Sequence, residues 1–121
     1  MNTLSDKSIR KLTGVNPLLI NVVKRAIEIS SVDFGVTEGL RSFKRQREMV
    51  RTKKSQTMNS KHLTGRAVDL VARINGSISW EWEYYIEIAK AMKQAAKELN
   101  VGIEWGGDWK FRDGVHFQLK D

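Results

Sequence analysis

The sequence predicts an α+β fold, in which a small and mainly antiparallel sheet carries its helices on one face. Several segments repeat apolar residues at the three- to four-residue spacing of amphipathic helices, and several short runs of β-branched and aromatic residues are typical of strands. With 121 residues, the chain is long enough for one hydrophobic core but not for two. We therefore expect a single domain over residues 1–121, built as two packed layers.

The N-terminal part of the chain predicts two helices. Ser5 is a suitable N-cap for a short helix over residues 5–13. Asn16 followed by Pro17 is a firmer signal, because asparagine favours the cap and proline the first helical position. Apolar residues then recur at helical spacing, which predicts a second helix over residues 17–30 with one buried face.

A strand and a basic helix are expected next. The β-branched and aromatic residues at 32–37 predict an edge strand. Ser42 can cap a helix that continues to about Arg51, in the most basic stretch of the chain. The predicted apolar side of this helix consists of Phe43, Met49 and Val50. The polar residues 52–61 show no periodicity, which is typical of a surface loop beside a cleft.

The central part of the chain predicts a strand, a tight turn and the longest helix. Residues 67–74 have the composition of a strand, and Asn75-Gly76 is typical of a tight hairpin turn. Ser79 is the expected N-cap of a helix over residues 80–99. Its predicted buried stripe consists of Trp82, Tyr85, Ile86, Ala89, Met92, Ala96 and Leu99.

The C-terminal part predicts two more strands. Asn100 is a suitable residue to end the long helix, and residues 101–105 resemble a strand. Residues 106–109 are expected to turn the chain, and residues 115–119 to form the last strand. We find no internal repeat and no linker.

Composition and charge narrow the function classes. The chain has no cysteine, so a disulfide framework and a thiolate metal site are both excluded. Its formal charge of +7 predicts attraction to polyanions such as nucleic acid, anionic lipid or acidic cell-envelope polymer, without choosing among them. There is no apolar run of membrane-spanning length and no secretory signal, so we expect no integral membrane association and synthesis in the cytoplasm.

The chain has only two histidines, His62 and His116, and each lies in a polar motif close to a predicted strand. Side chains alternate across a strand, so Asp69 should face away from its apolar neighbours, as should His116 and Gln118 in the last strand. Both faces would then lie on the side of the sheet that the helices leave open. Two imidazoles and a carboxylate can bind a catalytic zinc ion with one position left for water.

Two further residues are candidates for catalysis. Asp113 precedes His116 by three residues and could act as the general base, although Asp113-Gly114 is also a common turn sequence. Arg41 could donate two parallel hydrogen bonds to a carboxylate or a developing oxyanion, or it could be a solvated surface arginine. Glu38 could orient Arg41 or pair with a surface lysine.

Together these motifs resemble a known peptidase family. Residues 60–69 read S-x-H-x-x-G-x-A-x-D, residues 105–109 read WGGDW, and residues 113–118 read D-x-x-HFQ. This order resembles the family of D-alanyl-D-alanine carboxypeptidases and L-alanyl-D-glutamate endopeptidases, and it is most similar to the short phage endolysins of the endopeptidase branch. With residues 37–42, the resemblance covers roughly residues 35–119.

The resemblance implies a zinc peptidase with the hedgehog/D-Ala-D-Ala-peptidase fold. By matching motif positions, one zinc ion would be bound by His62, Asp69 and His116, while Asp113 would be the base and Arg41 would assist at the substrate. Many members of the family have glutamate at the base position, and the aspartate here fits the endopeptidase branch. Further candidates for substrate binding are Ser60, Trp105 and Trp109. Ser60 could instead be a helix cap, and the two tryptophans could belong to the core.

The implied function is a zinc-dependent endolysin that hydrolyses the L-alanyl-D-glutamate bond of the peptidoglycan stem peptide during phage-induced lysis. We expect a monomer with no separate cell-wall-binding domain, as in enzymes that act on thin Gram-negative walls. It would remain in the host cytoplasm until a separate protein permeabilises the membrane, and then act on the periplasmic wall. The alternatives are a D,D-carboxypeptidase or dipeptidase of the same family and a basic nucleic-acid-binding module. An iron(II) oxygenase usually has its first histidine and acid closer together.

Overall fold

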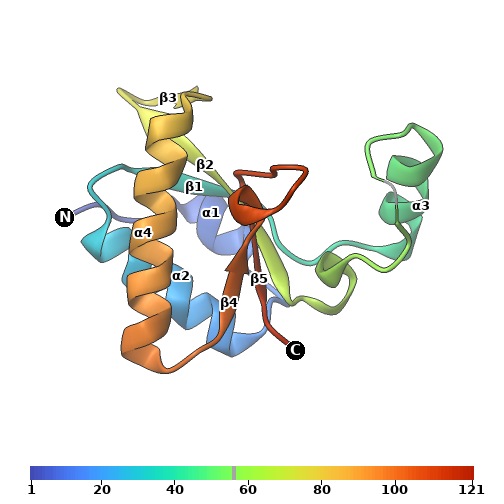
Figure 1. Cartoon of the computed structure of the whole chain (residues 1–121), viewed down its shortest axis with the longest axis horizontal. Helices are drawn as coiled ribbons and strands as arrows, with labels where there is room; N and C mark the ends of the chain where they lie inside the picture. The colour runs from blue at the N-terminus through green and yellow to red at the C-terminus, as the bar shows by residue number, and fades with distance from the viewer. Residues whose placement is uncertain (56) are drawn as a thin grey trace.

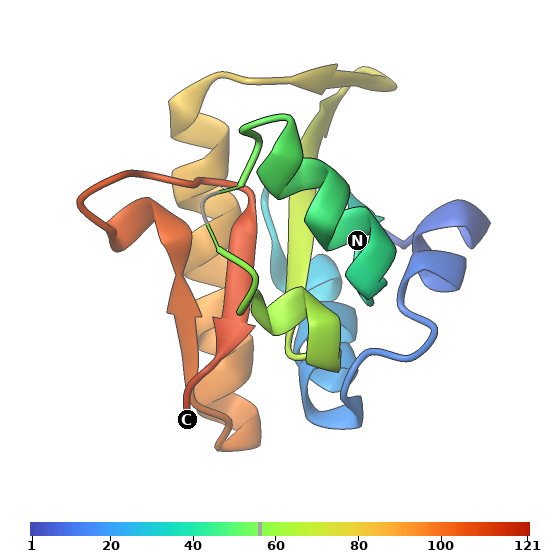
Figure 2. The same cartoon turned by 90° about the vertical axis from the view of Figure 1, so that its right-hand side faces the viewer.

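The computed structural model describes residues 1–55 and 57–121, and its elements are shown in Figures 1 and 2. The helices are α1 (Asp6–Lys11), α2 (Pro17–Ile29), α3 (Phe43–Arg51) and α4 (Trp82–Leu99), with two short 3-10 turns, η1 (Lys61–Thr64) and η2 (Gly106–Asp108). The strands are β1 (Phe34–Glu38), β2 (Ala67–Ile74), β3 (Ser77–Ser79), β4 (Ile103–Trp105) and β5 (His116–Leu119).

The strands form one antiparallel sheet in the order β1-β2-β5-β4, and β3 pairs with the end of β2. Helices α2 and α4 pack against each other and cover one face of this sheet (Figure 1). Helix α3 stands clear of that layer, in front of the opposite face (Figure 2). The predicted α+β class is confirmed, and α3 lies outside the α2–α4 layer. No helix among the described residues is both long and apolar enough to cross a membrane.

The alternation predicted for the two central strands is confirmed. Val68 and Leu70 of β2 are fully buried against the helices, as is Phe117 of β5. Asp69 lies between Val68 and Leu70, and His116 directly precedes Phe117. Both side chains therefore project from the face that α2 and α4 leave open. The packing of the core thus decides which way the candidate ligands point.

The predicted caps of the first three helices are also confirmed. The side chains of Ser5, Asn16 and Ser42 each accept a hydrogen bond from a backbone N–H in the first turn of their helix. Asn100 ends α4 in the left-handed conformation, with a φ of 57°. These short-range signals fix the helix boundaries because they satisfy backbone groups that the helix itself leaves unpaired.

The predicted start of α4 is wrong. Ser79 belongs to β3, where it pairs with Ala72 of β2. The turn at Asn75 and Gly76, with φ values of 53° and 83°, returns the chain along β2, so the ladder continues past the expected cap. The helix begins at Trp82 after Glu81, and the Glu81 side chain makes no capping bond to any described residue.

The buried stripe of α4 is rotated from the predicted one. Of the predicted stripe, the structure buries Tyr85, Ala89, Met92 and Ala96 and leaves Trp82, Ile86 and Leu99 partly exposed. It also buries Ile88, Ala91 and Ala95, which were not in the prediction. The reason is that α4 packs on α2 as well as on the sheet, so its buried face is wider than one stripe and points between the two neighbours.

The predicted apolar side of α3 is wrong at its first residue. Phe43 is 65% exposed, and Met49 and Val50 are only partly buried. Within α3, which the structure describes completely, only Gln46 is buried. Because α3 does not pack on the α2–α4 layer, polar contacts rather than an apolar face hold it.

Tyr85 joins α4 to the β2–β3 hairpin. Its hydroxyl donates to the carbonyl of Ser79 at 2.8 Å and accepts from the N–H of Ala72 at 3.2 Å. Burial raises the pKa of Tyr85 above its usual value. The folded protein therefore keeps the phenol proton to a higher pH than the unfolded chain does. The resulting stability is complete below a pH of about 10 and is lost as the pH rises through the raised pKa.

We expect Tyr85→Phe to lower the free energy of unfolding by about 1 kcal/mol at pH 8, because it removes both hydrogen bonds while keeping the ring. Denaturant unfolding at pH 8 and pH 11 measures this difference. The difference in free energy of unfolding between wild type and variant should be smaller at pH 11. At that pH, ionisation of Tyr85 in the unfolded chain lowers the stability of the wild type only. The same difference in free energy of unfolding at both pH values would contradict the role given to the Tyr85 hydroxyl.

Candidate metal centre

Strand register places Asp69 directly opposite His116 on the neighbouring strands β2 and β5. The N–H of Leu70 donates to the carbonyl of Val115, so hydrogen-bonded pairs flank the 69–116 pair on the ladder. A pair that is not itself hydrogen-bonded brings its side chains closest together. Accordingly, Nδ1 of His116 lies 3.4 Å from Oδ1 of Asp69.

His62 reaches the same place from η1. Ser60 caps this turn by accepting a hydrogen bond from the N–H of His62 at 3.2 Å, and Gly65 ends it at a φ of 70°. A side chain at Gly65 would collide with the carbonyl of Gly14, so glycine is required there for space as well as for conformation. The result is that Nε2 of His62 lies 3.1 Å from the same Oδ1 of Asp69.

Each histidine ring is oriented through its other nitrogen. Nδ1–H of His62 donates to the carbonyl of Gly39 at 2.8 Å, and Nε2–H of His116 donates to Oε1 of Gln118 at 2.9 Å. The nitrogens left to face Asp69 are therefore Nε2 of His62 and Nδ1 of His116. Such outer hydrogen bonds are the usual means of fixing the tautomer of a metal-binding histidine.

The three side chains fit a metal ion bound through two nitrogens and one oxygen. Their candidate ligand atoms all lie within 4.8 Å of one another, and both histidines are buried. Tetrahedral zinc with bonds of about 2.0–2.1 Å separates its ligand atoms by about 3.3 Å. The two distances to Asp69, 3.1 and 3.4 Å, agree with that spacing. The predicted convergence of His62, Asp69 and His116 is therefore found.

The electrostatics of the cluster keep Asp69 ionised. Burial alone would raise its pKa, but hydrogen bonds with His116 and His62 outweigh burial and hold the pKa of Asp69 well below its usual value. For His116, burial lowers the pKa, while hydrogen bonds with Asp69 and Gln118 raise it and prevail. A carboxylate that stays charged at neutral pH is suited to metal binding.

Asp113 borders the same cleft. Its N–H donates to the carbonyl of Gly106 at 2.9 Å, and its carbonyl accepts from the N–H of His116 at 3.2 Å, which fixes the segment beside the candidate metal ligands. Burial, together with the negative charge of Asp69, raises the pKa of Asp113. A carboxyl group whose pKa is raised toward neutrality can both accept and release a proton.

Arg41 is buried and held on three sides. Its Nε and Nη2 donate to the two carboxylate oxygens of Glu38 at 2.5 and 2.7 Å, and its Nη1 donates to Oε1 of Gln46 at 2.7 Å. Glu38 therefore pairs with Arg41 rather than with a surface lysine. Glu38 also occupies the Nε–Nη2 edge of the guanidinium, so this pair of donors is not free for the substrate contact that we expected. Arg41 therefore contributes a positive charge to the cleft, and Glu38 and Gln46 fix the orientation of its guanidinium.

A β-bulge positions Glu38. Val36 pairs with Leu70, yet the next pair along the ladder joins Glu38 to Asp69, so β1 carries one extra residue. The extra residue shifts Glu38 onto the open face of the sheet, beside the candidate metal ligand Asp69. The sequence carries no signal for this irregularity, because the bulge appears only once β1 is paired with β2.

Gln46 is a residue that sequence reasoning missed. Its side chain is fully buried, accepts from Arg41, and donates through Nε2 to Oγ of Ser55 at 3.0 Å and to the carbonyl of Thr57. It thereby connects Arg41 to the loop that forms one wall of the cleft. Glutamine is common on exposed helix surfaces, so nothing in the local sequence distinguishes this one.

We expect Gln46→Leu to lower turnover about tenfold, because Arg41 and the loop lose their shared hydrogen-bond partner and a small displacement is costly at a reacting centre. The free energy of unfolding should fall by about 1–3 kcal/mol, since buried donors and acceptors are left unpaired. Steady-state kinetics and denaturant unfolding measure the two effects. Gln94→Leu, on the exposed side of α4, is the matched control and should change neither. A fully active Gln46→Leu protein would contradict this role.

The cleft has a volume of about 370 Å³ and lies between the open face of the sheet and the segment that follows α3. Besides His62, Asp69 and His116, its lining includes residues of α3 and the segment that follows it, namely Met49, Lys54, Ser55, Thr57 and Asn59, and also Arg41, Ser60, Asp113, Trp109 and Gln118. The expectation that residues 52–61 form a loop beside a cleft therefore agrees with the described residues up to the start of η1, and Gln56 lies outside them.

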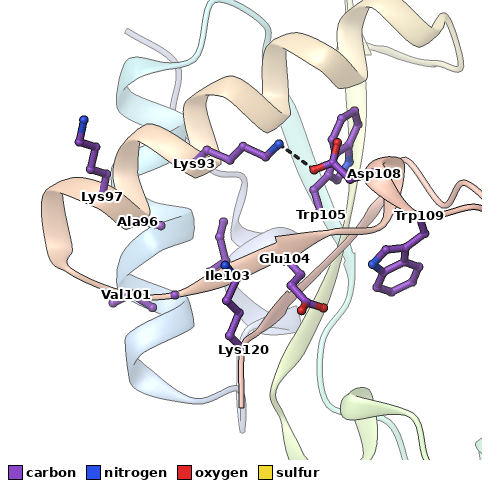
Figure 3. Close-up of a pocket in the computed structure, with 11 residues that line it drawn as sticks. Lys93, Ala96, Lys97, Val101, Ile103, Glu104, Trp105, Asp108, Trp109 and Lys120 are labelled. Carbon is purple, nitrogen blue, oxygen red and sulfur yellow. Dashed lines mark hydrogen bonds and ion pairs between the residues drawn. The ribbon is translucent and has the colours of Figure 1, made fainter.

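The two candidate tryptophans differ in burial, and only Trp109 borders the cleft. Trp109 is 37% exposed, and its ring lies 5.2 Å from that of His116 in the cleft. Trp105 is only 7% exposed and does not border the cleft. It borders a second hollow, of about 620 Å³, between α4 and β4, where Lys93 pairs with Asp108 at 2.8 Å (Figure 3). Figure 3 also shows Trp109 directed away from α4.

Comparison with known protein families gives one consistent result. Residues 1–120 match a family described as phage L-alanyl-D-glutamate peptidase. The chain is 34% identical over 115 residues to the L-alanyl-D-glutamate peptidase of Escherichia phage T5, in an alignment that covers 92% of this chain and 84% of that protein. It is also 34% identical over 119 residues to the Bacillus subtilis (strain 168) peptidoglycan L-alanyl-D-glutamate endopeptidase CwlK, covering 82% of this chain and 68% of CwlK.

Comparison with solved structures agrees. The crystal structure of the Serratia marcescens L-Ala D-Glu endopeptidase ChiX superposes with a TM-score of 0.93 and 51% sequence identity. The superposition covers 98% of this chain and 91% of ChiX. The arrangement of helices and strands is therefore shared over almost the whole chain.

Proposed function

We propose a zinc-dependent mechanism from the premise that this chain belongs to the phage L-alanyl-D-glutamate peptidase family and is an L-alanyl-D-glutamate endopeptidase. The observation that carries the proposal is the convergence of Nε2 of His62, Nδ1 of His116 and Oδ1 of Asp69. This donor set contains nitrogen and oxygen only, and the distances from the two histidine nitrogens to Asp69 suit tetrahedral zinc.

Each residue then has a defined task. His62, Asp69 and His116 would hold the ion, which when bound supplies Lewis-acid chemistry by polarising a carbonyl and lowering the pKa of water. Asp113 accepts the proton of the attacking water and later donates it to the amine of the departing D-glutamate. Arg41, fixed by Glu38 and Gln46, stabilises negative charge that develops at the scissile carbonyl.

The substrate in this proposal is the peptidoglycan stem peptide, bound in the 370 Å³ cleft with Trp109 and Ser60 at its border. We further propose that residues 1–121 work as one catalytic domain and as a monomer. In a lytic cycle the enzyme would wait in the host cytoplasm until another protein permeabilises the membrane. Family membership favours this activity over a D,D-carboxypeptidase and over a nucleic-acid-binding module.

Metal dependence gives the direct test. The purified protein should clear a suspension of bacteria stripped of their outer membrane, lose this activity in a strong chelator, and regain it when zinc is added. The turbidity of the suspension is the measurement, and mass analysis of the released fragments should show new D-glutamate amino termini. Undiminished clearing after complete removal of divalent ions would refute the zinc mechanism, and cleavage at another bond would refute the substrate assignment.

A further inference from the structure

Another hollow, of about 600 Å³, shares Arg41 with the cleft as a lining residue. Its walls come from the end of α1, from the segment that leaves β1 and from the first turns of α3. Arg10, Lys11 and Arg45 supply its cationic side chains, and we call it the cationic hollow. Figure 1 shows the segment between β1 and α3 running outward from the sheet.

The cationic side chains of Arg10, Lys11 and Arg45 form no ion pair with any residue that the structure describes. In residues 1–55 and 57–121, no carboxylate lies within ion-pair distance of Arg10, Lys11 or Arg45. The one carboxylate in the lining, that of Glu38, is bound through both oxygens by Arg41. In the hollow beside β4, by comparison, one of the three lining lysines, Lys93, is paired with Asp108 (Figure 3). Concentrated, uncompensated positive charge attracts anionic groups.

The cationic hollow adjoins the catalytic cleft. Arg41 borders both. Glu38, in the wall of the hollow, is paired across the ladder with the candidate metal ligand Asp69. A polymer that occupies the cleft and continues past Arg41 would therefore meet Arg10 and Arg45 next.

We propose that the cationic hollow is a second substrate-binding site, which takes free carboxylates of stem peptides next to the one being cut. This inference rests on the proposed function. A glutamate that is linked to both neighbours keeps one free carboxylate, so every stem peptide of the polymer carries at least one anionic group. Contacts with adjacent stems hold the enzyme on the wall between cuts, and they add nothing to the cleavage of an isolated peptide.

The test compares two variants of equal net charge on two substrates. Arg10→Gln with Arg45→Gln removes two charges from the hollow, whereas Lys24→Gln with Lys97→Gln removes two exposed charges from the α2–α4 layer. The substrates are purified sacculi, freed of lipid and nucleic acid, and a soluble N-acetyl-L-alanyl-D-glutamyl peptide. On sacculi, we expect the hollow variant to raise the apparent KM about fivefold and the control variant to change it less than twofold. On the soluble peptide, both variants should keep the wild-type kcat/KM.

Co-sedimentation with sacculi, measured on the same proteins, gives a second readout that needs no cleavage. The hollow variant should sediment less than the control, and salt at about 0.5 M should remove the difference by screening. The proposal would be overturned if both variants lost the same amount of binding to sacculi. It would also be overturned if the hollow variant lowered kcat/KM on the soluble peptide as much as it impaired the reaction on sacculi. Selective loss of binding to anionic phospholipid vesicles, with sacculi unaffected, would overturn it in favour of a lipid. If instead the proposed function is wrong, the wild-type protein itself will cleave neither substrate at the L-alanyl-D-glutamate bond. Co-sedimentation would still show whether the cationic hollow binds sacculi, because it needs no cleavage.

Discussion

Replacing His116 with alanine is expected to abolish metal binding and peptidase activity together. His116 provides one of the three candidate ligand atoms, and its loss leaves Asp69 with a single histidine partner. Loss of only an outer hydrogen-bond partner of a metal ligand usually costs about 10–100-fold in affinity or activity, so loss of the ligand itself should exceed about 100-fold. Metal content after dialysis against limiting zinc and the rate of turbidity loss measure the two effects.

The chain offers a graded control for this experiment. Gln118 accepts the hydrogen bond from Nε2–H of His116 without being a ligand, so Gln118→Ala should weaken metal binding by only about 10–100-fold. Zinc at 100 times its Kd should stabilise the wild-type protein by about 2.7 kcal/mol, because it binds the folded state. The His116→Ala protein should show no such gain in thermal unfolding. A His116→Ala protein that retains stoichiometric zinc and wild-type clearing would refute the metal centre.

Replacing Asp113 with asparagine is expected to separate metal binding from catalysis. The amide keeps nearly the shape of the carboxyl group and cannot accept the proton, so turnover should fall about 100- to 10,000-fold. Zinc content should stay at the wild-type level, because Asp113 is not among the three converging ligands. The loss should appear in kcat with little change in KM, as for an interaction made in the transition state.

Asp108→Asn is the matched control for Asp113→Asn. Asp108 lies in the same connection between β4 and β5, but its carboxylate pairs with Lys93 on the side of α4, outside the cleft. Its replacement should leave kcat unchanged. Equal kinetics for the Asp108 and Asp113 variants, or a metal-loaded and fully active Asp113→Asn protein, would remove Asp113 from the mechanism.

The sequence predicted most of the fold because its strongest signals act over short distances. Caps such as Ser5 and Asn16 satisfy the first turn of their own helix, and alternation along β2 follows from the geometry of a single strand. The errors lie where distant segments compete with a local preference. Ser79 could cap a helix, but pairing with Ala72 places it in a strand. Phe43 could be buried, but α3 lies away from the apolar layer.

The candidate ligands were identified from sequence, and their arrangement was not. Residue type and alternation were enough to select His62, Asp69 and His116 and to direct the last two toward one face. Register alone places Asp69 beside His116, and the turn at Gly65 alone brings His62 to the same oxygen atom. The pairing of Glu38 with Arg41 was one of two alternatives that the sequence offered. The contact of Arg41 with Gln46 and the cationic hollow could not be predicted, because each combines segments whose contact depends on the complete fold.

The sequence by itself therefore determined the elements, the class of fold and the chemical type of the site, since these follow from periodicity, capping and residue chemistry within a few residues. Only the tertiary structure decided the bulge that turns Glu38 toward Arg41, the burial of Gln46 and the detachment of α3 from the other helices. The physical reason is that a hydrogen bond or an ion pair between distant segments depends on distances that strand pairing and helix packing set, and no local pattern encodes them.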